Sequence, residues 1–285
     1  MSAAVDLSGA ADLHCHFGPD AHRARSVTGL EAAREAAASG HAALVLKSHD
    51  YPTAPLATLI DELVPGVKVF GGICCDREVG GVNPAAVETS LRLGAKIVWL
   101  PTLSSRQDVR NGVAAQLGIT GPGIAVIDEQ TGELLPETLQ VMDLVADHDA
   151  ILATGHISAE EHLAVAKAFG RRGRLVVTHA REDLAGPNLT EAQCVALAEL
   201  GATIELCAMT CIGALASRPV ADLAACARAV GSGRCTLATD YGQAANPHPA
   251  AGLQGFADAL VAEGLSPSEV RHMACDNPTH LLGLA

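Results

Sequence analysis

The segment AADLHCH, residues 10–16, sets the pattern from which the fold of this chain follows. It is short and mostly apolar, and it ends just before a Gly-Pro pair at residues 18–19. Side chains alternate between the two faces of a β-strand, so His14 and His16 point to the same side. A solvated edge strand with two chance histidines is one interpretation. The other is a buried strand whose paired imidazoles begin a metal site, for which the rest of the chain must supply further ligands.

Seven further apolar segments follow, and amphipathic helical stretches separate them. They are AALVLKS (42–48), VKVFGGI (67–73), AKIVWLP (95–101), AILATGH (150–156), RLVVTHA (174–180), ATIELCA (202–208) and CTLATDY (235–241). Alternating strands and helices predict a parallel sheet with right-handed crossovers. Eight such units within 285 residues predict an α/β fold of the closed (β/α)₈ barrel type, with an open, doubly wound sheet as the alternative. We expect residues 1–285 to form one domain.

Several helix ends can be recognised from capping residues. Thr28 with Glu31, and Ser158 with Glu161, have the spacing of a capping box at a helix start. Glycines that precede the next strand indicate helix ends at Gly40, Gly94, Gly173 and Gly201.

One connection is much longer than the others. Residues 102–135, after the fourth strand, exceed an ordinary strand–helix loop. Within them, GIAVIDEQTGELL (123–135) predicts a small hairpin that turns at residues 130–132. We expect this insertion to cover the active site, with a decorative or oligomer-forming segment as the alternative.

Composition limits the classes of partner. The net charge is −13, with no basic block to offset it, which argues against nucleic acid or an anionic membrane as a partner. Nine cysteines follow no disulfide or zinc-finger spacing, and reduced thiols in a cytoplasmic protein are the expectation. No segment has the length of a membrane span or the pattern of a signal peptide. We expect a small-molecule substrate, and a homo-oligomer is an open alternative.

Polar residues gather where the strands end, which is where barrel enzymes place their active sites. They are His14, His16, Lys47, His49, His156, His179 and Asp240. An unpaired ammonium near a barrel mouth is costly, so Lys47 in particular calls for a function. Imidazole and carboxylate ligands suit zinc, manganese, iron or nickel better than calcium. The pattern therefore predicts one or two divalent ions, with zinc as the first choice.

These motifs resemble the amidohydrolase superfamily of metal-dependent hydrolases, and the resemblance spans nearly the whole chain. It is carried by DLHCH (12–16), GH (155–156), THA (178–180), ATDYG (238–242) and DNPTHLLGL (276–284). It implies a barrel that cleaves amide, ester or phosphoester bonds with one or two metal ions. It also implies that His14, His16 and Asp240 bind the more buried ion, and His156 and His179 the more exposed one.

The sequence departs from the superfamily at the ligand that bridges two ions. Binuclear members use a carbamylated lysine or a glutamate at the end of strand 4, where this chain has VWLPT (98–102). Lys47 is the only lysine expected at the carboxyl end of a strand. Desolvation favours the neutral amine, which can react with CO₂ to form a carbamate. A carbamate on Lys47 is one hypothesis; a single metal ion, or a bare Lys47 that holds a substrate carboxylate, are the others.

The expected reaction is hydrolysis of an amide, lactam or lactone bond of a small molecule by metal-bound hydroxide. Asp240 is the expected catalytic residue, which moves the proton from nucleophile to leaving group. Candidate substrate-binding residues are His49, Arg181 and His248. Phosphoester or phosphotriester hydrolysis and metal-dependent decarboxylation are alternative reactions on the same barrel. A catalytically silent metal-binding barrel is the alternative from a different class.

Overall fold

The computed structural model describes residues 4–284, whose central feature is a sheet of eight parallel strands paired in sequence order. The sheet closes on itself, because His16 N donates to Tyr241 O at 2.8 Å and Asp240 N donates to His14 O at 2.9 Å. The (β/α)₈ barrel predicted from the sequence is thereby confirmed. The strands are β1 (Ala11–His16), β2 (Ala43–Lys47), β3 (Lys68–Cys74), β4 (Ile97–Trp99), β5 (Ile151–Ala153), β6 (Arg174–Val177), β7 (Thr203–Cys207) and β8 (Cys235–Ala238).

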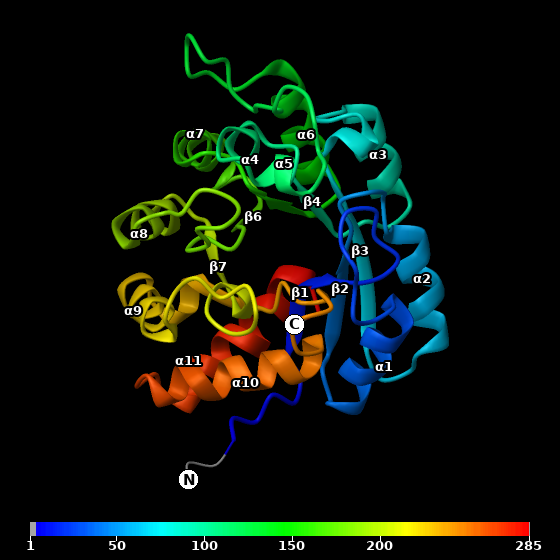
Figure 1. The fold of residues 1–285 in the computed structure, drawn as a ribbon, viewed down its shortest axis with the longest axis vertical. Helices are drawn as coiled ribbons and strands as arrows, with labels where there is room; N and C mark the ends of the chain where they lie inside the picture. Colours follow the sequence, from blue (N-terminus) through cyan, green and yellow to red (C-terminus); the bar gives the residue numbers. More distant parts are fainter. Residues whose placement is uncertain (1–3, 285) are drawn as a thin grey trace.

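Helices surround the barrel (Figure 1). The main helices are α1 (Gly29–Ala38), α2 (Ala54–Leu63), α3 (Pro84–Arg92), α6 (Pro136–Asp147), α7 (Ala159–Phe169), α8 (Glu191–Glu199), α9 (Val220–Val230) and α10 (Pro249–Ala262). Shorter helical segments are α4 (Arg106–Arg110), α5 (Val113–Gln116), α11 (Pro267–Arg271), α12 (Asn277–Leu282), η1 (Arg77–Val79), η2 (Ala208–Thr210), η3 (Ser232–Arg234) and η4 (His272–Asp276). Within residues 4–284, no helix has the length and apolar character needed to cross a membrane.

The helix boundaries follow local capping chemistry. Both predicted capping boxes are present, at Thr28 before α1 and at Ser158 before α7. Gly40, Gly94 and Gly201 have positive φ angles. Gly173 was wrongly predicted to end a helix, because α7 stops at Phe169 and the Phe169 ring packs against Gly173 instead.

The barrel interior is filled by small and branched side chains, as expected for this fold. One buried cluster joins the inward faces of the strands to the end of α12. Leu281 and Leu282 of α12 pack in this cluster with Ala11, Leu13 and Val45. The C-terminal helix therefore contributes to the packed interior, and the polar side chains occur at the carboxyl ends of the strands.

An irregularity in β1 sets the direction of its histidines. Asp12 pairs with Leu44 and Cys15 pairs with Leu46, so three steps along β1 match two steps along β2. Such a β-bulge re-aims the side chains that follow it. Leu13 packs in the barrel interior, whereas Cys15 packs in the cluster formed with α1 and α2.

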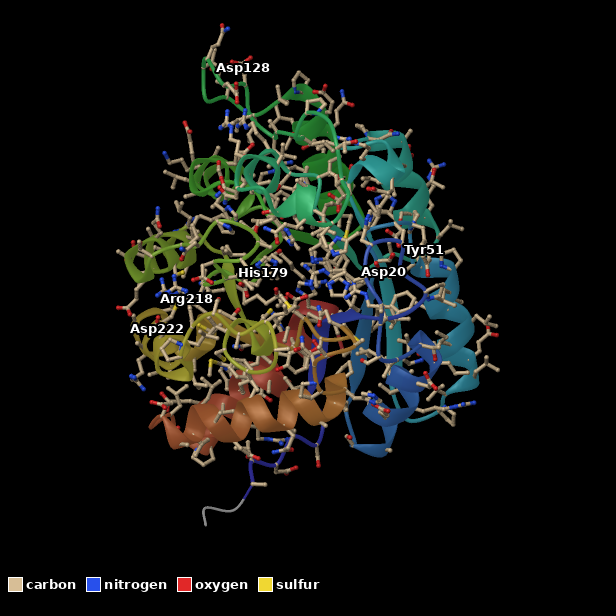
Figure 2. All side chains as sticks on the ribbon, viewed as in Figure 1. Asp20, Tyr51, Asp128, His179, Arg218 and Asp222 are labelled. Atoms are coloured by element: carbon tan, nitrogen blue, oxygen red, sulfur yellow. The ribbon has the colours of Figure 1, made fainter. Side chains whose placement is uncertain are left out.

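The long connection after β4 divides into two parts. Its first part contains α4 and α5, and its second part is a small hairpin in which Ile127 pairs with Leu134. The hairpin turn is closed by Gly132 N, which donates to Asp128 O at 2.8 Å. Figure 2 shows Asp128 at the outer tip of this hairpin, far from His179 in the middle of the ring of helices.

Candidate metal centre

The carboxyl ends of six strands place polar side chains around the mouth of the barrel. These side chains are His14 and His16 (β1), Lys47 (β2), His49 (after β2), His156 (after β5), His179 (after β6), Glu205 (β7) and Asp240 (after β8). Each is at most 4 % exposed. A group of ionisable residues this deeply buried must be compensated by partners or by a bound cation.

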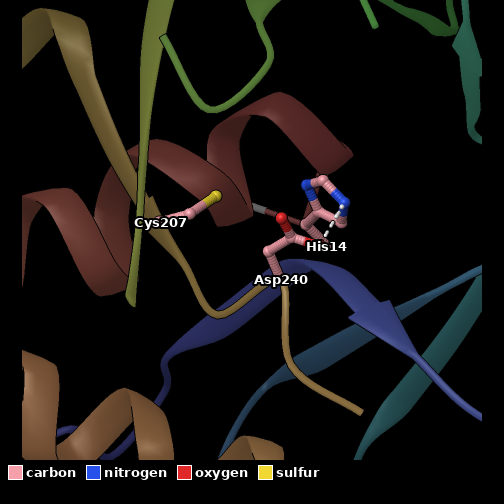
Figure 3. A group of neighbouring side chains, drawn as sticks. All are labelled: His14, Cys207 and Asp240. Atoms are coloured by element: carbon pink, nitrogen blue, oxygen red, sulfur yellow. Dashed lines mark ion pairs between the residues drawn. The ribbon is translucent and has the colours of Figure 1, made fainter. Parts of the chain in front are cut away.

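His14, His16 and Asp240 lie close together within this group. Asp240 Oδ1 lies 3.1 Å from His14 Nε2 and 3.1 Å from His16 Nε2. Figure 3 shows His14 and Asp240 side by side, with Cys207 of β7 facing them. Cys207 offers a ligand atom within 4.8 Å of ligand atoms of His14 and Asp240, although burial raises the pKa of its thiol well above the ordinary value.

The electrostatics of this trio favour a cation between its members. Burial alone would raise the pKa of Asp240, but His14 and His16 hold it well below its ordinary value. Burial likewise opposes protonation of His14, yet the carboxylates of Asp240 and Glu205 raise its pKa to about 9. The two carboxylates thus favour a positive charge at His14. Either a proton or a metal ion can supply that charge.

Two further carboxylates, those of Glu205 and Asp12, contact His14. Glu205 Oε2 lies 3.1 Å from His14 Nδ1, and it accepts a hydrogen bond from His179 N at 3.0 Å. Asp12 Oδ1 accepts from His14 N and from Thr239 N, each at 3.1 Å. Glu205 leaves the Nε2 atom of His14 directed at Asp240, as a metal-ligating histidine requires.

Lys47 lies against His14 at the centre of the group. Its Nζ atom is 3.0 Å from His14 Nε2 and 5.6 Å from the centre of the Trp99 ring. Trp99 ends β4, the strand from which the superfamily's bridging ligand would come. The structure therefore places the amine of Lys47 beside a candidate ligand atom.

His156 and His179 make a second histidine pair, with ring centroids 4.6 Å apart. Burial, followed by the charge of Lys47, lowers the pKa of His156 to about 3. Burial, followed by His156, lowers the pKa of His179 well below its ordinary value. Both rings are therefore neutral, which is the form that binds metals.

The insertion supplies a carboxylate that orients His156. Asp108 of α4 is fully buried, and its Oδ2 atom lies 2.6 Å from His156 Nδ1. Its Oδ1 atom accepts from Gly186 N, in the loop after β6, at 2.8 Å. Asp108 thereby joins the insertion to the loop that follows the strand of His179, and its contact with Nδ1 leaves the Nε2 atom of His156 on the opposite side of the ring.

His49 is held by a separate set of buried groups. Its Nδ1 atom lies 2.6 Å from Thr102 Oγ1 and 3.3 Å from Asp76 Oδ2. Its ring stacks on His16, with centroids 4.9 Å apart. Burial, followed by the charge of Lys47, lowers the pKa of His49 well below its ordinary value, so this ring is neutral.

A cavity of about 270 Å³ is lined by five of these residues, His16, His49, His156, His179 and Asp240. Its remaining wall combines apolar and polar side chains: Leu103, Val113, Leu117, Leu184, Met209, Leu215, His22, Arg23, Arg25, Gln116, Ala185 and Gln243. Four of them, Leu103, Val113, Gln116 and Leu117, belong to the first part of the insertion. The volume suits a small molecule.

Arg181 and His248 are not brought to this cavity, so the structure corrects the expectation that they bind substrate there. The Arg181 guanidinium donates to Leu189 O and lies 3.9 Å from Asp222 of α9. His248 precedes α10, is half exposed, and pairs with Glu35 of α1 at 2.8 Å. It lines a separate groove of about 810 Å³.

The donor set fits a divalent metal ion. Zinc–nitrogen and zinc–oxygen bonds of roughly 2.0–2.1 Å place neighbouring ligands about 3.3 Å apart in a tetrahedral site. The two 3.1 Å separations around Asp240 Oδ1 are close to this value. Two imidazoles and one carboxylate are also an appropriate ligand set for zinc, manganese or iron. His14, His16 and Asp240 would hold such an ion, with His156 and His179 available for a second.

Sequence reasoning missed the carboxylates that position these ligands. Glu205 interrupts the apolar segment ATIELCA, and Asp12 precedes the two histidines in the first strand. An acidic residue inside an apolar strand segment is the sequence signal from which Glu205 and Asp12 could have been predicted. Asp76 lies in a loop and Asp108 in the five-residue helix α4, and neither segment has a periodic pattern long enough to distinguish these residues from solvated ones.

Comparison with known proteins then places the chain in a family. The model of a family of unknown function, DUF6282, matches residues 9–205. The chain belongs to this family. The matched region includes every candidate ligand except Asp240, which lies beyond its end. No curated protein gives a significant match.

Solved structures share the fold at low sequence identity. An amidohydrolase from Pseudomonas aeruginosa is 11% identical, with a TM-score of 0.63 over 96% of this chain and 95% of that one. A probable dipeptidase from the same organism is 10% identical, with a TM-score of 0.65 over 96% and 94%. A putative 2-pyrone-4,6-dicarboxylic acid hydrolase from Pseudomonas putida is 18% identical, with a TM-score of 0.57 over 97% and 98%. At the level of the fold, the resemblance to amidohydrolase-superfamily barrels is confirmed.

Proposed function

We propose that this member of the DUF6282 family is a metal-dependent hydrolase that cleaves an amide, lactam or lactone bond of a small molecule. The observation that carries the proposal is that Asp240 Oδ1 lies 3.1 Å from His14 Nε2 and 3.1 Å from His16 Nε2. They adjoin a small cavity that two more neutral histidines line. A purely structural metal site is usually closed by four protein ligands, whereas this one adjoins a cavity.

The protein's own groups can complete the chemistry. A divalent ion, when bound, polarises the scissile carbonyl and lowers the pKa of water at the site. Asp240 stays ionised, because His14 and His16 hold its pKa low, so its carboxylate can accept a proton from the attacking water. The same carboxylate can then return that proton to the leaving group, as general acid–base catalysis requires. Leu103, Leu117 and Leu184 line the cavity and limit access of bulk water.

We further propose zinc as the preferred ion and a carbamate on Lys47 as the bridge between two ions. The amine nitrogen would attack the carbon of CO₂ and lose a proton, which leaves an anionic carbamate. The position of Lys47 Nζ beside His14 Nε2 supports this. A crystal structure of metal-replete protein tests it: density that extends beyond Nζ to two ions supports the bridge, and one ion beside a bare amine contradicts it.

The names of the structural neighbours suggest which substrates to compare. They include a probable dipeptidase, a putative 2-pyrone-4,6-dicarboxylic acid hydrolase and a 2,6-dihydroxybenzoate decarboxylase from Rhizobium. These activities belong to the neighbours. For this chain, the cavity of about 270 Å³ favours a compact substrate.

The test is a substrate panel on metal-replete protein whose metal content is measured by elemental analysis. The panel holds small lactams, linear amides, lactones, chromogenic phosphoesters and 2,6-dihydroxybenzoate. We expect hydrolysis of the lactams, amides or lactones, and loss of nearly all turnover in Asp240→Asn while the fold remains. Turnover of phosphoesters alone, decarboxylation alone, or wild-type rates in Asp240→Asn would each contradict the proposal.

A further inference from the structure

The buried residues that hold His49 have a fixed pattern of donors and acceptors. Asp76 Oδ1 accepts hydrogen bonds from the backbone N–H groups of Thr102 and Ser104, both at 2.9 Å. Asp76 Oδ2 accepts a hydrogen bond from the Thr102 hydroxyl. The same Thr102 oxygen lies 2.6 Å from His49 Nδ1. Asp76 and Thr102 are both fully buried, and His49 is 4 % exposed.

Counting protons in this pattern determines the tautomer of His49. A threonine hydroxyl has one proton, and here Asp76 receives it. The Thr102 oxygen must therefore act as the acceptor toward His49, so Nδ1 carries the ring proton. A neutral imidazole has only one N–H, which leaves Nε2 with a free lone pair. His49 thus presents a hydrogen-bond acceptor on the side of the ring away from Thr102.

This acceptor belongs to the wall of the candidate active site. His49 lines the cavity together with His16 and His156. Its ring stacks on His16 and meets the His156 ring edge-on, with centroids 6.2 Å apart. His49 therefore stands between a candidate ligand of the first ion and a candidate ligand of the second.

We propose that His49 makes the enzyme selective for substrates that carry an N–H next to the bond cleaved, namely secondary amides and lactams. This inference rests on the hydrolase function proposed above. An N–H can donate to the free Nε2 lone pair. A lactone oxygen or an N-methyl nitrogen has no proton to donate and would leave this acceptor without a partner from the substrate. Sites built around a hydrogen bond to substrate discriminate strongly against analogues that lack it.

The first experiment compares a small lactam, its N-methyl derivative and the lactone of the same ring size. With wild-type protein we expect kcat/KM for the lactam to exceed that for the N-methyl derivative by about tenfold or more. His49→Asn keeps an amide N–H toward Thr102 but removes the acceptor at the Nε2 position. We expect this variant to lose most of the preference by slowing the lactam alone. Thr102→Val should weaken the preference in the same direction, because it removes the acceptor for the Nδ1 proton.

A matched control makes the same change at another buried histidine. His41 is 3 % exposed and lines the groove near α10 rather than the active-site cavity. His41→Asn should therefore leave the ratio of lactam to N-methyl lactam rates unchanged. Elemental analysis of each variant separates a substrate contact from metal binding: loss of an ion in His49→Asn would make His49 a ligand and overturn the proposal.

Two readouts do not need turnover. Calorimetry should show that a cyclic urea binds more tightly than its N,N′-dimethyl derivative, and that His49→Asn removes this difference. The ¹⁵N NMR spectrum of histidine-labelled protein should show His49 protonated at Nδ1. Protonation at Nε2, or equal binding of the two ureas, would overturn the inference.

If metal-replete protein cleaves lactones best and His49→Asn leaves the ratios unchanged, this inference fails while the proposed function stands. If no panel compound is hydrolysed, the proposed function fails, and the urea and NMR results still decide whether His49 is an acceptor.

Discussion

At the scale of single residues, buried carboxylates orient the rings of the candidate ligands. Glu205 contacts His14 Nδ1 and Asp108 contacts His156 Nδ1, so the opposite nitrogen of each ring faces the site. Such outer contacts fix the ring orientation of metal-binding histidines. The arrangement separates the residues that would touch a metal ion from those that position them.

His162 of α7 is a buried histidine outside the site, and it predicts a pH effect on stability. Burial is the main cause that lowers its pKa to about 4, against about 6.5 in an unfolded chain. Well above pH 6.5 the ring is neutral in both states. As the pH falls toward 4, the unfolded chain binds a proton that the folded protein does not, so stability decreases. This residue should account for about 2 kcal/mol of lost stability between pH 7 and pH 5.

Urea unfolding of wild type and His162→Leu at these two pH values measures the effect. The variant replaces the ring by an apolar side chain that cannot bind a proton, so its free energy of unfolding should fall less between pH 7 and pH 5. The comparison uses the difference between the two proteins, because the other buried histidines contribute equally to both. An identical pH dependence in the two proteins would show that His162 does not carry the effect.

At the scale of elements, close approach between strand ends places His156. Gly155 has a φ of +64°, and a Cβ atom there would lie 2.2 Å from Leu100 O and 2.6 Å from Pro101 O. His156 N donates to Pro101 O at 2.9 Å, directly after this glycine. Only glycine allows the end of β5 to pass so near the end of β4.

Gly155→Ala should therefore destabilise the fold and displace His156. The left-handed conformation alone costs about 1–2 kcal/mol for alanine, and the backbone contacts add to this cost. Gly94→Ala is a matched control, since Gly94 has a φ of +94° and no atom within 4 Å of its added Cβ. Urea unfolding and metal content measure both variants. Equal losses of stability, with metal content unchanged in both, would contradict the role given to Gly155.

At the scale of the whole molecule, closure of the barrel brings the residues of the site together. The backbone hydrogen bonds between β1 and β8 bring Asp240 beside His14, although 226 positions separate them in the chain. The insertion after β4 adds Asp108 behind His156 and four residues to the cavity wall, while its hairpin extends outward. The site is thus assembled from every part of the chain, and an ion bound there would hold those parts together.

Metal removal should consequently lower the stability of the whole barrel. A ligand that binds only the folded state stabilises it by about 2.7 kcal/mol when its free concentration is 100 times its Kd. We expect the Tm of chelator-treated protein to rise when zinc is added, as measured by calorimetry. His16→Asn removes one candidate ligand and should abolish most of this rise. A rise of equal size in His16→Asn would place the ion elsewhere.

The amino-acid sequence by itself determined the barrel and most of the candidate ligands. Strand–helix alternation is a local pattern, and polar residues at the ends of apolar segments can be read without knowing any contact. His14, His16, Lys47, His156, His179 and Asp240 were all located in this way, and the structure brings them together at one mouth. Their roles remain proposals.

Only the tertiary structure decided which other residues join them. Asp76 and Thr102 lie in loops and Asp108 in the short helix α4, and their significance depends on contacts between segments far apart in the chain. Arg181 and His248 follow strands as active-site residues do, yet salt bridges and hydrogen bonds to neighbouring elements hold them elsewhere. The direction of a side chain in a loop follows from such long-range contacts, whereas that of a strand residue follows from the period of the strand.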